Sequence, residues 1–125
     1  RSNYTALAHR ELEKLMPGSA DLTPLTFDAH GHLVDASLWS PDIAKALAEQ
    51  EKIALTSEHL QISLLLRSFY AETEVVPEMR PFVKLVRERL AMEKGDSIYL
   101  MGLFGGSPAK TAARIAGLPK PTNCL

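Results

Sequence analysis

The sequence predicts a mostly α-helical protein: a small helical bundle with an N-terminal β-hairpin before it and a flexible C-terminal arm after it. Signals that start helices recur along the chain, and apolar residues follow each of them at helical spacing. Both observations favour the bundle. The arm is predicted by Pro119 and Pro121, because two prolines prevent a helix over the last residues and favour an extended chain.

The N-terminal part is expected to contain one short helix and the hairpin. Apolar residues share a helical face over residues 4–16, and Pro17-Gly18 ends that pattern. Residues 18–24 are polar and rich in turn-forming residues, as is typical of a linker. In residues 25–35, apolar side chains lie on both sides of Gly31, which adopts positive φ easily. This segment therefore predicts the hairpin.

Two helices with clear starts come next. Ser40-Pro41 places an N-cap residue before a proline at the first helical position, and an apolar face follows. Thr56-Ser57-Glu58 begins a second helix, which is apolar on more than half of its circumference. We expect this second helix to be the central and most buried one.

The next two elements are marked by proline and glycine. Pro77 and Pro81 both signal a helix start, so one of them is expected outside the regular helix. Gly95 ends that element. A short apolar helix over residues 98–104 follows, with Asp96-Ser97 as its cap.

The last helix leads into the arm. Ser107-Pro108 repeats the start signal, residues 108–116 are rich in alanine, and Gly117 is suited to the left-handed position that ends a helix. We therefore expect three parts: an N-terminal extension over residues 1–25, a helical domain over residues 26–117, and an arm over residues 118–125.

The composition indicates one domain in a reducing compartment. The chain has 125 residues, of which 46% are hydrophobic and 23% charged, as in ordinary globular domains. Its net charge of −1 lacks the basic excess of a duplex-DNA-binding protein. No apolar run approaches the roughly 20 residues of a membrane span, and no signal peptide is visible. A single cysteine excludes an internal disulfide, so we expect a cytoplasmic protein with no membrane partner.

Cys124 has the clearest potential for chemistry. It is next to the last residue and follows two prolines, where burial is difficult. Exposure matters because sulfur transfer requires a thiolate to reach a sulfur atom on another protein. Lys120 would favour the thiolate, whereas the terminal carboxylate would disfavour it. The alternative is an idle thiol on a chain end, although folding requires no surface thiol there.

Basic residues at helical spacing suggest a docking face for acidic partners or for tRNA phosphates. The candidates are Arg80, Lys84, Arg87, Lys110 and Arg114. Glutamates near them weaken any positive field, and a solvated helix face is the alternative.

The other polar residues predict no metal and no cofactor. His30 and His32 lie on either side of Gly31, but a metal site would need two further ligands. His59, in the first turn of a helix, is expected to be packed or partly exposed rather than catalytic. The chain contains no phosphate-binding or dinucleotide-binding glycine motif, no serine-hydrolase motif and no pair of acidic residues at acid/base spacing.

The C-terminal run and several internal segments resemble the DsrC/TusE family. Residues 115–125, with cysteine as the penultimate residue, look like the signature arm of that family. The internal matches, in order along residues 30–125, are Leu55-Thr56-Ser57-Glu58-His59, Leu66-Arg67-Ser68-Phe69-Tyr70, Lys94-Gly95-Asp96-Ser97-Ile98-Tyr99-Leu100, Leu103-Phe104 and Pro108-Ala109-Lys110.

The resemblance implies a helical domain with a hairpin and a mobile arm, on which Cys124 carries sulfur as a persulfide. The TusE branch accepts sulfur from the sulfurtransferase complex TusBCD. It passes the sulfur to the tRNA thiolase MnmA for 2-thiolation of the wobble uridine, so contact with tRNA would be only indirect. The arm and docking residues would then be Gly117, Leu118, Pro119, Lys120 and Pro121.

Ala113 separates this chain from the other branch of the family. DsrC proteins work with dissimilatory sulfite reductase and have a second arm cysteine, at the position that Ala113 occupies here. An arm with one cysteine holds a persulfide but forms no internal disulfide or trisulfide. The resemblance therefore favours the TusE-like sulfurtransferase role. The alternatives are a DsrC-type carrier, a regulatory or DNA-binding module, and an interaction domain with an idle cysteine.

Overall fold

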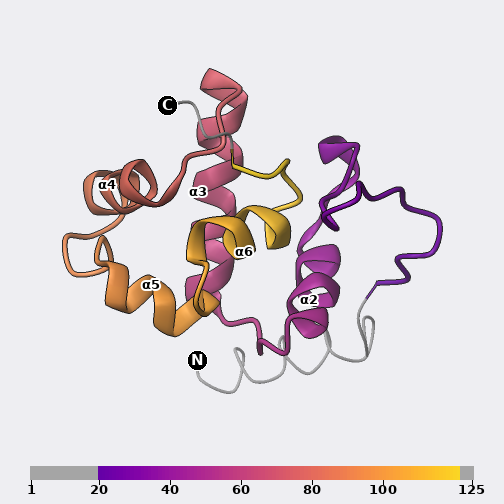
Figure 1. Cartoon of the computed structure of the whole chain (residues 1–125), viewed down its shortest axis with the longest axis horizontal. Helices are drawn as coiled ribbons and strands as arrows, with labels where there is room; N and C mark the ends of the chain where they lie inside the picture. The colour runs from indigo at the N-terminus through magenta and orange to yellow at the C-terminus, as the bar shows by residue number, and fades with distance from the viewer. Residues whose placement is uncertain (1–19, 122–125) are drawn as a thin grey trace, which may run out of the picture.

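The computed structural model describes residues 20–121, which form a helical domain (Figure 1). After a 3-10 helix, η1 (Ala36–Leu38), five α-helices follow: α2 (Pro41–Gln50), α3 (Ser57–Thr73), α4 (Met79–Arg89), α5 (Ser97–Phe104) and α6 (Pro108–Ile115). The predicted helical fold class is confirmed. The helix predicted over residues 4–16 lies outside the described residues, so the N-terminal extension stays a prediction.

Local signals set the ends of most of these helices. Ser40, Thr56 and Asp96 cap α2, α3 and α5, and each accepts a hydrogen bond from a backbone N–H of the first turn. Pro81 lies in the first turn of α4, where its missing N–H leaves no helical hydrogen bond unmade, and Pro77 lies before the helix. The predicted starts are therefore confirmed, and of the two prolines it is Pro77 that stands outside.

Helix α6, not α3, occupies the centre of the bundle. It packs against α2, α3, α4 and α5 (Figure 1). Ala112, Ala113 and Ile115 are fully buried, and the small alanines let the neighbouring helices approach closely. On α3, by contrast, Leu64 is 51% exposed. The expectation that α3 is the most buried helix is wrong, because its apolar surface is wider than the area its neighbours cover.

The predicted N-terminal hairpin is not confirmed. Within the described residues, Phe27 and Leu33 form an isolated antiparallel bridge, and no strand extends from it. Gly31 does take a positive φ of 83°. The carboxylate of Asp28 accepts hydrogen bonds from the backbone N–H groups of His30 and His32 at 2.9 Å, which closes a tight turn. The N–H of Asp28 donates to the carbonyl of His32 at 2.8 Å and that of Val34 to the carbonyl of Thr26 at 2.9 Å, but the chain enters η1 at Ala36, which limits the pairing to this bridge.

Candidate functional site

Cys124 lies outside the described residues, but Pro121, three residues before it, is described and buried. A chain extends by at most about 3.6 Å per residue, so the Cα atom of Cys124 lies within about 11 Å of the Cα atom of Pro121. The surface that surrounds residues 117–121 is therefore the described surface that bears on the predicted role of Cys124. We call residues 115–118, where α6 ends and the arm begins, the arm root.

A compact cap ends α6 at the arm root. Gly117 adopts a left-handed φ of 73°, as predicted. Its N–H donates to the carbonyl of Arg114 at 3.1 Å, and the N–H of Leu118 donates to the carbonyl of Ala113 at 3.0 Å. This pair of bonds is a Schellman motif, which satisfies two of the last helical carbonyls and reverses the chain.

Three side chains from different parts of the chain bind three of the four carbonyls of the arm root. The indole Nε1–H of Trp39 donates to the carbonyl of Ile115 at 2.8 Å. One guanidinium nitrogen of Arg67 donates to the carbonyl of Ala116 at 2.9 Å. Nδ1 of His32 lies 2.9 Å from the carbonyl oxygen of Leu118. We call these three residues the socket.

The socket residues also support one another. The guanidinium carbon of Arg67 lies 4.5 Å from the centre of the Trp39 ring, which is cation–π geometry. The second terminal nitrogen of Arg67 donates to the carbonyl of Ala36 at 2.9 Å, which ties η1 to α3. Partial burial lowers the pKa of the Arg67 guanidinium below its usual range. Because the cation sits at the C-terminal end of α6, it also interacts favourably with the dipole of that helix.

His32 is the most enclosed member of the socket, with 0% of its surface exposed. A carbonyl oxygen only accepts, so Nδ1 carries the proton, and Nε2 has no hydrogen-bond partner among the described residues. Burial lowers the pKa of His32 below its usual 6.5, while the Leu118 carbonyl and Asp28 act in the opposite direction. Burial, the largest of these effects, thus favours neutral His32.

The arm does not start as a free tail. Leu118 is 1% exposed and belongs to the hydrophobic core. Pro119 and Lys120 are exposed, and Pro121 is buried again. The predicted flexible arm is therefore not confirmed over residues 118–121, because the socket and the core hold Leu118 in place.

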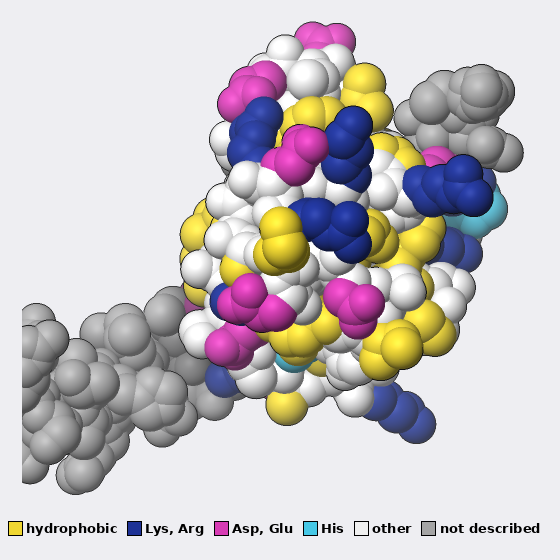
Figure 2. Space-filling model, turned by 90° about the vertical axis from the view of Figure 1, so that its left-hand side faces the viewer, with side chains coloured by type: hydrophobic (Ala, Val, Ile, Leu, Met, Phe, Trp, Pro, Cys, Tyr) yellow, Lys and Arg dark blue, Asp and Glu magenta, His cyan; other side chains and the backbone are white. Residues whose placement is uncertain are grey.

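The basic residues predicted as a docking face are divided between two helices. Arg80, Lys84 and Arg87 are exposed on α4, where Arg87 also donates to the carbonyl of Gly95 at 2.9 Å. Figure 2 shows the side of the molecule formed by α4 and α5, on which Lys and Arg side chains lie among Asp, Glu and hydrophobic side chains. On α6, Lys110 is exposed.

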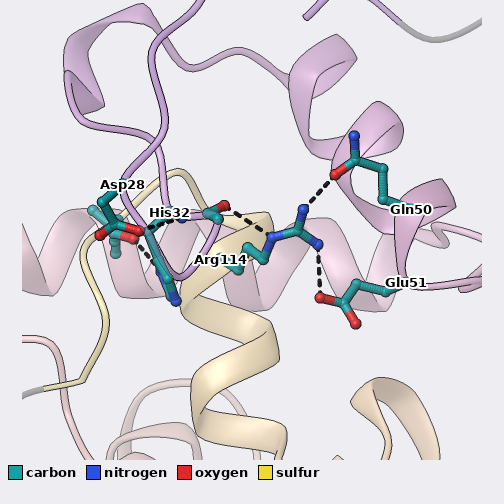
Figure 3. A network of polar contacts seen from close by, with 7 residues as sticks. Asp28, His32, Gln50, Glu51 and Arg114 are labelled. Atoms are coloured by element: carbon teal, nitrogen blue, oxygen red, sulfur yellow. Dashed lines mark hydrogen bonds and ion pairs between the residues drawn. The ribbon is translucent and has the colours of Figure 1, made fainter.

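Arg114, the other predicted cation of α6, lies inside a polar network (Figure 3). Its Nε donates to the carbonyl of Gly31 at 2.9 Å, and its terminal nitrogens bind Glu51 at 2.7 Å and the side-chain oxygen of Gln50. Arg114 thereby joins α6 to the end of α2 and to the turn that carries His32. The charge of Arg114 is offset by Glu51, whereas Lys110 is exposed.

His59 is buried and packed, as expected. Its Nε2 lies 2.7 Å from the carbonyl oxygen of Leu103, and its Nδ1 accepts a hydrogen bond from the N–H of Thr56 at 3.0 Å. Its ring meets that of Phe104 edge to face, with ring centres 5.1 Å apart. His59 thus joins the start of α3 to the end of α5. Within residues 20–121, no group of His, Cys, Asp and Glu has the arrangement of a metal site.

The socket was not predicted from the sequence. The available signals were a single tryptophan, Trp39, and a charged residue, Arg67, within the most apolar helix. A buried cation needs partners, so Arg67 in that helix indicated a specific contact. Its partners are backbone carbonyls, which no side-chain pattern in the sequence reveals.

Known proteins similar to this chain share one family. The family model described as DsrC like protein matches residues 20–125. A sulfurtransferase TusE from Buchnera aphidicola is 36% identical over 125 residues, which is 100% of this chain and 98% of the relative. A sulfurtransferase TusE from Pectobacterium atrosepticum is 47% identical over 98 residues, covering 78% of this chain and 90% of the relative.

Solved structures of DsrC proteins have the same fold as this chain. The NMR structure of Allochromatium vinosum DsrC superposes with a TM-score of 0.77 at 39% identity, covering 86% of this chain and 98% of that one. The crystal structure of the oxidized γ-subunit of dissimilatory sulfite reductase (DsrC) from Archaeoglobus fulgidus gives a TM-score of 0.69 at 38% identity, covering 81% and 92%. No helix within the described residues is long and apolar enough to span a membrane.

Proposed function

Because this chain belongs to the DsrC family, we propose that it is a sulfur carrier that holds sulfur as a persulfide on Cys124. The observation that carries the proposal is the range of residues that the family model matches, residues 20–125. It continues through the arm to residue 125, and so includes the single cysteine. Relatives named sulfurtransferase TusE, up to 47% identical, support the same activity.

The proposed transfer is an exchange between sulfur atoms. The Sγ thiolate of Cys124 attacks the outer sulfur of a donor protein's persulfide, and a new S–S bond forms as the donor's own S–S bond breaks. The donor leaves as a thiolate, and Cys124 now carries –S–SH. No oxidant or reductant is needed, since the transferred sulfur keeps its oxidation state. A thiol on the next protein of the relay then removes the outer sulfur in the same way.

The TusE-like relay is the form of this function that the chain fits best. We propose a TusBCD-like complex as donor, an MnmA-like tRNA thiolase as acceptor, and 2-thiolation of the tRNA wobble uridine as the outcome. The reaction would take place in the cytoplasm, where free thiols persist. A DsrC-type role with two arm cysteines is disfavoured by Ala113, a fully buried methyl group with no sulfur chemistry.

Intact-protein mass spectrometry tests the proposal. The protein is incubated with cysteine, a cysteine desulfurase and the TusBCD complex, and a gain of one sulfur, about 32 Da, is expected. Cys124→Ser should fold normally and gain nothing. Equal loading of Cys124→Ser would refute the role of Cys124. No gain on the wild-type protein, under conditions that load a known TusE, would refute the sulfur-carrier function.

A further inference from the structure

The carbonyls of the arm root are held far more firmly than a helix end requires. The Schellman motif already satisfies the carbonyls of Ala113 and Arg114. The socket then binds the carbonyls of Ile115, Ala116 and Leu118, one side chain to each. The peptide units on both sides of Gly117 are therefore fixed in position and in direction.

Gly117 shows how closely the arm root lies against Trp39. A Cβ atom on Gly117 would lie 2.4 Å from Cδ1 of Trp39, so the glycine backbone rests directly on the indole. The indole is itself held by its bond to Ile115 and by the guanidinium of Arg67. The Trp39 indole and the Arg67 guanidinium are planar and already lie against each other. They therefore lose little further conformational freedom when they bind the carbonyls of the arm root, which makes them rigid anchors.

The consequence for Cys124 is a short tether, by which we mean the residues that follow the last anchored residue, up to and including the cysteine. Counted from the buried Pro121, the tether spans three residues; counted from Ala116, at the end of α6, it would span eight. The effective concentration of a tethered group falls roughly as the −3/2 power of tether length once the span is reached. Releasing the arm root would thus dilute Cys124 about fourfold at a partner's pocket.

We infer that Trp39, Arg67 and His32 are positioning residues for sulfur transfer, because they fix the arm root and so present Cys124 to protein partners on a short tether. This inference rests on the proposed function. None of the three needs to touch the transferred sulfur. We expect their effect to be confined to encounters with a protein, since reaction with a small reagent does not require the arm to be held toward a partner.

The test compares transfer from a protein with reaction toward a small reagent. Trp39→Phe removes the N–H donor and keeps a ring beneath Arg67, whereas Arg67→Met removes both carbonyl contacts of the guanidinium. Arg89→Met is the matched control, because Arg89 contributes the same charge from a surface ion pair with Glu72 at 3.3 Å. Loading of Cys124 is measured against the concentration of sulfur-loaded TusBCD complex, at a temperature where urea titrations show every variant folded.

The two socket variants should need more donor for half-maximal loading, up to the limit of about fourfold set by complete release of the arm root, with the maximal rate unchanged. Alkylation of Cys124 by iodoacetamide should match the wild type in all variants, and Arg67→Lys should recover part of the loss. Faster hydrogen exchange at the Leu118 amide should accompany the defect. A merely structural role would lower stability without changing the half-maximal donor concentration.

Two outcomes overturn the inference, and they differ in what they leave standing. If folded Trp39→Phe and Arg67→Met load like Arg89→Met while the wild type gains sulfur on Cys124, the positioning role is refuted and the sulfur-carrier function stands. If the wild type gains no sulfur where a known TusE does, the proposed function fails and the inference fails with it.

Discussion

Replacing Gly117 with alanine tests the packing of the arm root most directly. Gly117 has a φ of 73°, and a left-handed conformation costs a residue with a Cβ atom about 1–2 kcal/mol. The new Cβ would also lie 2.4 Å from Cδ1 and 2.7 Å from Cγ of Trp39. The indole cannot move without losing its bond to Ile115, so overpacking adds about 1–3 kcal/mol. We expect Gly117→Ala to lower the free energy of unfolding by about 2–5 kcal/mol.

Two other glycines separate the contributions to this loss. Gly105 has a φ of 89° and a ψ of −160°, a conformation essentially restricted to glycine, but open space where a Cβ would lie, so Gly105→Ala should cost only the conformational part, about 1–3 kcal/mol. Gly102 lies within α5, also with open space, so Gly102→Ala should stabilise the protein by about 0.5–1 kcal/mol. Urea titrations of the three variants measure these differences. A loss for Gly117→Ala of no more than about 1–2 kcal/mol, the conformational cost alone, would refute the close contact with Trp39.

Two further predictions concern the polar network around the socket. The free energy of unfolding should fall as the pH drops below about 6.5, because unfolded His32 binds a proton where folded His32, with its lowered pKa, does not. His32→Gln should weaken that dependence in urea titrations between about pH 7.5 and 5.5, and an unchanged dependence would contradict the assignment. Arg114→Met should destabilise the protein by about 2 kcal/mol through the loss of its charged hydrogen bonds, whereas Lys110→Met, at an exposed site, should change stability by less than about 0.5 kcal/mol. Equal effects in thermal melts would show that the two cations do not differ in role.

The helix boundaries were predictable because the residues that set them act locally. Ser40, Thr56 and Asp96 each satisfy backbone groups within the same helical turn, so their effect depends on sequence neighbours alone. Gly117 was predictable for the same reason, since a left-handed helix end favours glycine. Ser107 marks the limit of this reasoning. It precedes α6 as expected, but its side chain makes no capping hydrogen bond.

The hairpin was not confirmed and the most buried helix was mispredicted, because both depend on more than the local sequence. Gly31 does form a turn with backbone pairing across it, but η1 begins two residues after Val34, the last paired residue, and ends the pairing. Helix α3 has the wider apolar surface, yet burial follows from how many neighbours a helix meets. The short α6 meets four of them, because its alanines allow close packing.

The sequence by itself determined the helical class, the starts of the helices and the identity of the one residue suited to sulfur chemistry, Cys124. These follow from local backbone preferences and from the reactivity of a side chain, neither of which needs a folded context. Only the tertiary structure decided how the arm begins. His32, Trp39 and Arg67 are separated by 86, 76 and 49 residues from the carbonyls that they bind. Every residue carries a backbone carbonyl, so the sequence cannot mark which ones a distant side chain will hold.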